Sequence, residues 1–178
     1  VAALAFASQH NRKSEDKRLL QMRMLHQITE KALMSLNLDD LLASTARLLK
    51  DYFLYYNVYI FIYDQEKDTL DLRAMAGSFE NEIPLPLTVS PSDGCVGYAY
   101  KTHETYYARD IREDPRYMPE IPDRIEALSE LAVPIMQGTN VLGVLDVQAD
   151  RPDSFDDFDL ESMNTLANEL ASAIMRAR

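Results

Sequence analysis

Cys95 is the residue best suited to covalent chemistry, and it is the single cysteine of this 178-residue chain. It follows Gly94 at the expected start of a short helix, where the helix dipole can lower the pKa of a thiol and make it a redox sensor. The alternative is a small buried thiol, which is the commoner environment of a free cysteine. One cysteine forms no internal disulfide, which is consistent with a reducing, cytoplasmic setting.

The other reactive side chains are not arranged for metal binding or catalysis. His10, His26 and His103 show no ligand spacing. The acidic run from Asp153 to Glu161 lacks the pattern of a calcium loop and fits helix capping instead. We therefore expect no metal, no cofactor and no enzymatic activity.

Composition narrows the choice of partner and location. The chain has 18 Lys and Arg against 29 Asp and Glu, a net charge of -11, which argues against nucleic acid as a partner. Its first seven residues are apolar and are followed by Arg12 and Lys13. They are either the end of a membrane helix or the front of a linker helix, and a span needs about 20 residues. The linker interpretation is therefore favoured, within a cytoplasmic protein or the cytoplasmic part of a membrane-anchored one.

The last third of the chain has the clearest structural pattern. Two apolar runs, Leu131–Met136 and Val141–Val147, flank a glycine-containing turn and predict a β-hairpin. Asp156 is a good N-cap, Asp159 stands at N3, and Phe155 precedes them as in a hydrophobic staple. A buried hairpin thus leads directly into an amphipathic helix, which we call the exit helix.

The preceding residues alternate between helix and strand patterns. The run 55–63 is apolar on both faces, with Val58, Ile60 and Ile62 pointing to one side, and predicts a central strand. Further elements are expected as helices over 15–35, 38–50 and 94–101, strands over 69–75 and 105–111, and a long loop over 112–129.

Two helical stripes raise the question of a dimer. Leu19, Met22, Leu25, Thr29, Ala32 and Leu36 recur at alternating steps of three and four residues, and Met163, Leu166, Leu170 and Ala173 do so on the exit helix. Either these stripes join two copies of the chain, through the N- and C-terminal helices, or they pack on the chain's own sheet. Both hypotheses stay open at this point.

The order of these elements, with five short motifs, resembles the GAF domain, a PAS-like sensory module of signal-transduction proteins. The motifs are Gly94–Gly97, Tyr107–Ile111, Glu130–Ile135, Val141–Val147 and Phe155–Asp159. The resemblance implies an α+β fold with a central antiparallel sheet of five or six strands flanked by helices, and with the long N- and C-terminal helices packed on one face. It divides the chain into a linker or signalling helix over 1–24 and the domain over 25–178.

The resemblance also implies a function. Such a domain binds a small molecule between the sheet and the short helix and signals through its terminal helices to a covalently attached output domain, such as a histidine kinase of a two-component system. The alternatives are an unliganded dimerisation module and a small thiol-based redox enzyme or sensor that uses Cys95. The ligand-binding residues implied are Ile60, Cys95, Tyr98, Tyr107, Asp110, Met118, Ile121 and Arg124.

Several of these residues could have a purely structural role instead, and the sequence does not identify the ligand. Ile60 and Met118 can simply fill a core, and Asp110 can accept hydrogen bonds from a neighbouring turn. Ala149 and Asp150 stand where cyclic-nucleotide GAF domains carry Asn-Lys, and the loop 112–129 has no cysteine to attach a bilin.

Overall fold

A curled six-stranded antiparallel sheet forms the centre of the molecule, in a computed structural model that describes residues 15–16, 18–20, 22–24, 26–27, 30, 37–78, 80, 83, 85–118 and 127–177. The strand order is β3-β2-β1-β6-β5-β4. The strands are β1 (Asn57–Asp64), β2 (Thr69–Gly77), β3 (Thr88–Val89), β4 (Tyr106–Ala108), β5 (Ser129–Gln137) and β6 (Asn140–Ala149). The predicted central strand is therefore central, between β2 and β6.

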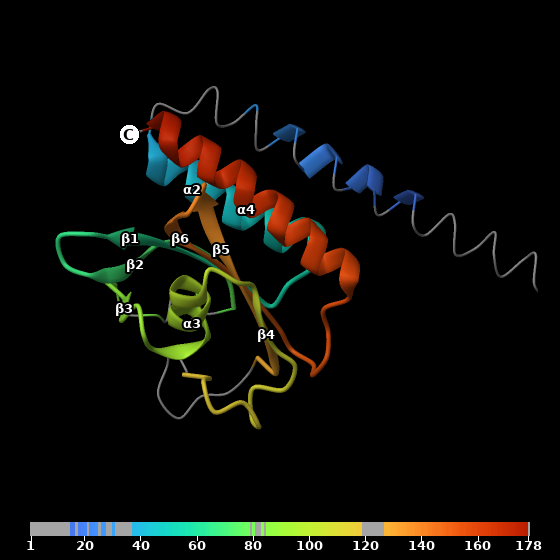
Figure 1. The fold of residues 1–178 in the computed structure, drawn as a ribbon. Helices are drawn as coiled ribbons and strands as arrows, with labels where there is room; N and C mark the ends of the chain where they lie inside the picture. Colours follow the sequence, from blue (N-terminus) through green and yellow to red (C-terminus); the bar gives the residue numbers. More distant parts are fainter. Residues whose placement is uncertain are drawn as a thin grey trace, which may run out of the picture.

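Helices cover the two faces of this sheet unequally (Figure 1). Helices α2 (Leu38–Phe53) and α4 (Asp157–Ala177) pack on one face, and the shorter α3 (Gly94–Thr102) packs on the other. We call these the long-helix face and the α3 face. The arrangement confirms the expected fold class, an antiparallel sheet with flanking helices and a long C-terminal helix.

The long-helix face has a predominantly apolar core. Val58, Ile60 and Ile62 of β1 point into it, where they join Leu131 of β5 and Leu166 of α4 in one buried cluster. Because side chains alternate along a strand, the neighbouring Tyr59 and Phe61 point to the α3 face. A bulge opposite Ile60 and Phe61 shifts the register of β2, so that Leu70 and Leu72 face α3 while Ala74 and Ala76 face the long helices.

Strands β5 and β6 form the predicted hairpin and lead into α4 as expected. Gly138 occupies the turn with φ +60°, a conformation that favours glycine. At the start of α4 the Asp159 N–H donates to the Asp156 side chain at 3.0 Å, and the Asp156 N–H donates to the Asp159 side chain at 2.9 Å. This reciprocal capping confirms the predicted helix start.

The structure places the residues of the two helical stripes differently. On α4, Met163, Leu166, Leu170 and Ala173 are all buried within the chain, which corrects their use as a seam between two copies. Near the N-terminus the described residues are helical, and Met24 is fully buried in the core while Leu19 and Met22 are exposed. Leu25, Thr29, Ala32 and Leu36 lie outside the described residues.

The predicted boundary between residues 24 and 25 stays a prediction, although Met24 contributes to the core of the domain. Among the described helices, none combines the length with the apolar composition that crossing a bilayer requires.

Candidate functional site

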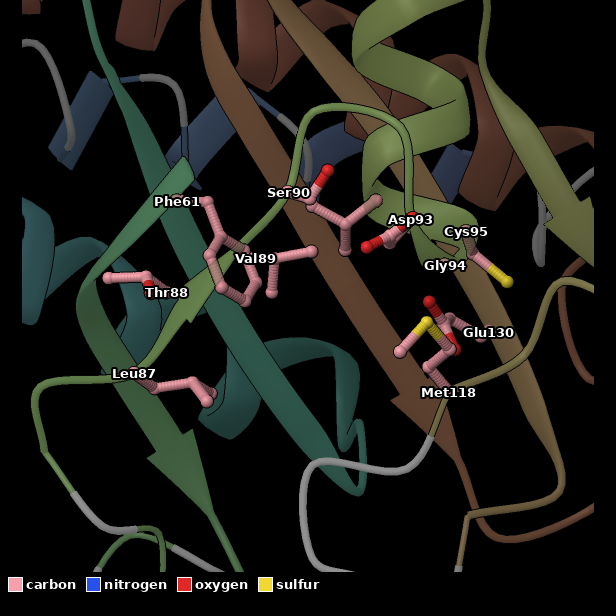
Figure 2. A pocket seen from close by; sticks show the side chains of 11 residues that line it. Phe61, Leu87, Thr88, Val89, Ser90, Asp93, Gly94, Cys95, Met118 and Glu130 are labelled. Carbon is pink, nitrogen blue, oxygen red and sulfur yellow. The ribbon is translucent and has the colours of Figure 1, made fainter. Parts of the chain in front are cut away.

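A cavity of about 200 Å³ lies on the α3 face, between the N-terminal turn of α3, strand β3 and the end of the loop that follows β4. Figure 2 shows Asp93, Cys95, Met118 and Glu130 along one side and Phe61, Leu87 and Val89 along the other. The cavity is smaller than the roughly 300–1,000 Å³ of drug-sized sites, so it suits a small metabolite. Its full lining is Phe61, Leu87, Thr88, Val89, Ser90, Asp93, Gly94, Cys95, Val96, Met118 and Glu130.

Two glycines seat α3 at the edge of this cavity. Gly94 begins the helix with φ +69°, which a larger residue adopts only with strain. A Cβ on Gly97 would lie 2.7 Å from the Ser90 carbonyl oxygen, so the glycine allows the helix to approach the segment after β3. Together they place Cys95 against the sheet and leave space beside Val89.

The sheet beneath α3 carries buried polar residues, which we call the polar floor and of which Glu130 lines the cavity. Glu130 is 4% exposed, and Asn57, Asp146 and Gln148 are at most 1% exposed. Asn57, Gln148 and Glu130 occupy one row across β1, β6 and β5, and the Asn57 amide donates to Gln148 at 3.0 Å. Asp146 lies in the next row, on the same face as Tyr59 and Ala132. Buried polar groups lower stability unless they are hydrogen-bonded, and Glu130 is the residue of this floor that a ligand in the cavity would contact.

Cys95 is a protonated buried thiol at neutral pH. It is 2% exposed, and burial raises its pKa well above the usual value, with further contributions from the negative charges of Glu130, Asp146 and Asp114. A pKa lowered by the helix N-terminus, the less favoured of the two alternatives, is not supported, because burial and nearby carboxylates oppose the thiolate. The structure supports the buried-thiol alternative.

The loop after β4 is fixed to α3 by an arginine. The Arg116 guanidinium lies 4.4 Å from the ring centroid of Tyr98 and 5.4 Å from that of Tyr106. The Tyr106 hydroxyl donates to Asp114 at 2.7 Å, and the two tyrosine rings meet edge to face. These contacts hold the loop so that Met118, two residues further on, lies over Gly94 at the cavity.

Two of the predicted site residues, Cys95 and Met118, line the cavity. Two others point to the wrong face of the sheet. Ile60 is fully buried in the long-helix core, and Tyr107 packs there too, accepting a hydrogen bond from the Phe155 N–H at 3.0 Å. In each strand the neighbouring residue, Phe61 or Tyr106, faces α3 instead, so these two predictions were one residue out of phase.

The remaining predicted residues are absent from the cavity lining or lie outside the described part. Tyr98 supports Arg116, and Asp110 accepts a hydrogen bond from the Arg112 N–H at 3.1 Å, which is the structural role considered for it. The Arg112 guanidinium, by hydrogen bonding, holds the pKa of the Asp110 carboxyl below its ordinary value. Ile121 and Arg124 lie outside the described residues. Ligand binding by any of these side chains stays a prediction.

Sequence reasoning missed the polar floor. Glu130, Asp146 and Gln148 sit inside otherwise apolar strands, and an acidic residue within such a run is the signal that could have found them. Among the described residues, no group of three or more His, Cys, Asp or Glu side chains is placed to hold a metal ion.

A larger hollow, of about 600 Å³, lies at the far end of the β5–β6 hairpin. Half of its lining residues are exposed polar side chains, among them Gln65, His103 and Asn140. It lacks the buried polar and apolar groups that orient a small ligand, so the smaller cavity is the better candidate.

Comparisons with known proteins agree on the family. The model of the GAF domain matches residues 35–175. GAF domain-containing protein A of Dictyostelium discoideum is 29% identical over 119 residues, which cover 66% of this chain and 69% of that protein.

Solved structures also align with this chain over most of its length. The GAF domain from the Acinetobacter phosphoenolpyruvate-protein phosphotransferase has a TM-score of 0.77 at 25% identity, covering 88% of this chain and 93% of that one. Free methionine-R-sulfoxide reductase of Neisseria meningitidis, solved with its substrate, also has a TM-score of 0.77, at 24% identity, covering 89% and 90%. At that identity the reductase shows a shared fold.

Proposed function

The chain belongs to the GAF domain family, and on that premise we propose that it is a regulatory input domain that binds a small molecule in the α3-face cavity. One observation carries the proposal: β5 contributes to both the cavity and the packing of the exit helix. Glu130 lines the cavity, whereas Leu131 and Val133 pack against α4 from the opposite face of the same strand.

Strand β5 is thus a short path from ligand to output. A ligand that moves Glu130 also moves Leu131, because adjacent residues of a strand share one backbone. The reciprocal caps of Asp156 and Asp159 fix the start of α4, and the Ser129 hydroxyl of β5 donates at 2.7 Å to the Arg151 carbonyl in the connection that leads to it. A ligand that binds one conformation of this hairpin more tightly than another would shift α4 toward the position that goes with that conformation.

The output in this proposal is a further domain covalently attached through α4, and a histidine kinase of a two-component system is one such domain. The Acinetobacter relative is itself a GAF domain from a larger enzyme. We propose no enzymatic role for the present chain. Turnover of peroxide or free methionine sulfoxide by the wild-type chain, lost in Cys95→Ser, would contradict that part.

A homodimer through the terminal helices is part of the proposal, now centred on the N-terminal helix. Leu19 is 49% exposed and Met22 is 67% exposed, while Met24 on the same helix is buried. Light scattering at high micromolar concentration should give a dimer mass that falls in Met22→Glu. A strict monomer would contradict the dimer and leave the cavity proposal standing.

The cavity proposal is tested by ligand-induced stabilisation. A ligand that binds the folded chain at a hundred times its Kd adds about 2.7 kcal/mol to the free energy of unfolding. We expect at least one member of a metabolite collection to raise the Tm of the wild type and not of Val89→Trp, which fills the cavity from an edge strand. Glu66→Trp, which adds the same bulk in the exposed β1–β2 turn, is the control. Equal shifts in all three proteins, or none, would contradict the proposal.

A further inference from the structure

The two sides of strand β4 contact different parts of the molecule. This strand stands at the edge of the sheet and pairs with β5. Tyr106 packs on the α3 face, whereas Tyr107 packs against the long-helix core. Because side chains alternate along an extended strand, one short element can hold both the loop at the cavity and the exit helix.

On the α3 face, Tyr106 holds the loop that reaches the cavity. Its hydroxyl donates to Asp114 at 2.7 Å, and the Arg116 guanidinium donates to the same hydroxyl at 3.4 Å. Arg116 also lies over the Tyr106 ring, and two residues further on Met118 lines the cavity. A change in the position of this loop therefore acts on Tyr106.

On the opposite face, the same segment holds the exit helix and the connection that leads to it. The Phe155 N–H donates to the Tyr107 hydroxyl at 3.0 Å, and that hydroxyl donates to Asp153 at 3.2 Å. The rings of Phe155 and Tyr107 meet edge to face. Just before β4, the Thr105 hydroxyl donates at 2.8 Å to the Asn164 side chain of α4. Because hydrogen bonds are directional, these contacts fix the position of the start of α4.

We propose that β4 is a second route by which the cavity acts on the exit helix, with Tyr107 as its positioning residue. A shift of the loop that carries Met118 moves Tyr106, and the shared backbone then moves the Tyr107 hydroxyl that holds Phe155. This rests on the proposed function, in which a ligand in the cavity signals through α4. The β5 route acts through non-directional packing of apolar side chains such as Leu131, and β4 adds a hydrogen-bonded link to it.

The test perturbs the loop and measures amide hydrogen exchange at the start of α4 by NMR, on ¹⁵N-labelled protein without ligand. Arg116→Ala, at an exposed position, removes contacts with Tyr106 and should speed exchange at least twofold over residues 155–164. Tyr107→Phe keeps the ring and should speed exchange of the Phe155 amide by about fivefold, since a hydrogen bond contributes about 1 kcal/mol. Adding Arg116→Ala to Tyr107→Phe should then change exchange over residues 155–164 little further.

Tyr55→Phe is the matched control. The Tyr55 hydroxyl also holds the start of α4, where it donates to Asp159 at 2.9 Å, but this residue comes from the segment before β1 rather than from β4. In the Tyr55→Phe protein, Arg116→Ala should speed exchange over residues 155–164 as it does in the wild type. A purely structural role for Tyr107 would make the two tyrosine variants respond alike.

Two results would overturn this proposal. If Arg116→Ala leaves exchange over residues 155–164 unchanged, the loop is not coupled to the exit helix. If it speeds that exchange equally in the Tyr107→Phe and Tyr55→Phe proteins, the coupling does not pass through Tyr107. Neither result concerns ligand binding, which the Tm comparison with Val89→Trp tests separately, so a failure of the β4 route is distinguishable from a failure of the cavity proposal.

Discussion

The two faces of the sheet differ in polarity and in packing. On the long-helix face, residues such as Ile60, Leu131 and Leu145 form a continuous apolar core with α2 and α4. On the α3 face, the same strands bury Glu130 and Asp146 and leave a cavity beside Cys95. The first face supplies stability and the second gives up part of it, which is the usual relation between a scaffold and a binding site.

The largest expected difference between the faces is in how much the free energy of unfolding falls when apolar atoms are removed. Leu131→Ala should lower the free energy of unfolding by about 2–5 kcal/mol, because Leu131 is fully buried in the long-helix core. Val89→Ala removes two methyl groups from the cavity wall and should cost under about 1 kcal/mol, because one side of Val89 already faces empty space. Urea unfolding of both variants measures the contrast, and equal costs would contradict it.

The junction between the hairpin and α4 should respond to pH. Burial, together with the nearby Asp156 carboxylate, raises the pKa of Asp159 above its ordinary value of 3.8, although the Tyr55 hydroxyl donates to it at 2.9 Å and favours the charged form. The folded state therefore holds this proton more tightly than the unfolded state does. This part of the stability is present below about pH 3.8 and is lost as the pH rises through the raised pKa.

In Asp159→Asn, the free energy of unfolding should therefore fall less steeply as the pH rises. The measurement is a set of urea unfolding curves from about pH 4 to about pH 7. Asp157→Asn, in the exposed first turn of α4, should leave the wild-type slope in place. Identical slopes in the wild type and Asp159→Asn would show that Asp159 does not titrate differently on folding.

The smallest expected effect concerns the loop over the cavity. Arg116→Ala removes the contacts with Tyr98 and Tyr106, each worth about 0.5–1 kcal/mol at an exposed site. We expect faster amide exchange over residues 112–118 with little change in Tm. Arg112→Ala, which removes the ion pair with Asp110 instead, is the comparison variant. A large drop in Tm would show that the loop belongs to the core of the fold rather than to the cavity.

Sequence patterns predicted the scaffold well because they report periodic burial. The alternation of Val58, Ile60 and Ile62 with Tyr59 and Phe61 correctly assigned the two faces of β1. The caps Asp156 and Asp159 correctly located the start of α4, because such residues act locally. The short β4 was expected to be longer, since its flanking residues follow a strand pattern while its pairing with β5 covers Tyr106–Ala108.

The candidate site was harder to predict because it depends on which elements meet. The alternation that separated Ile60 from Phe61 did not say which face α3 would cover, so the wrong residue of the pair was assigned to the cavity. Glu130 and Asp146 are 16 positions apart in the chain and become neighbours through the register of β5 and β6. The pKa of Cys95 depends first on burial and then on those carboxylates, so its direction could not be obtained from the helix position alone.

The central claim, that β5 couples the cavity to the exit helix, is tested most directly by hydrogen–deuterium exchange with and without a metabolite that raises the Tm of the wild type. The account predicts slower exchange at residues 129–135 and also along α4 between Met163 and Ile174, with little change in α2, and no effect in Val89→Trp. Slower exchange confined to residues 88–96, with α4 unchanged at saturating ligand, would contradict it.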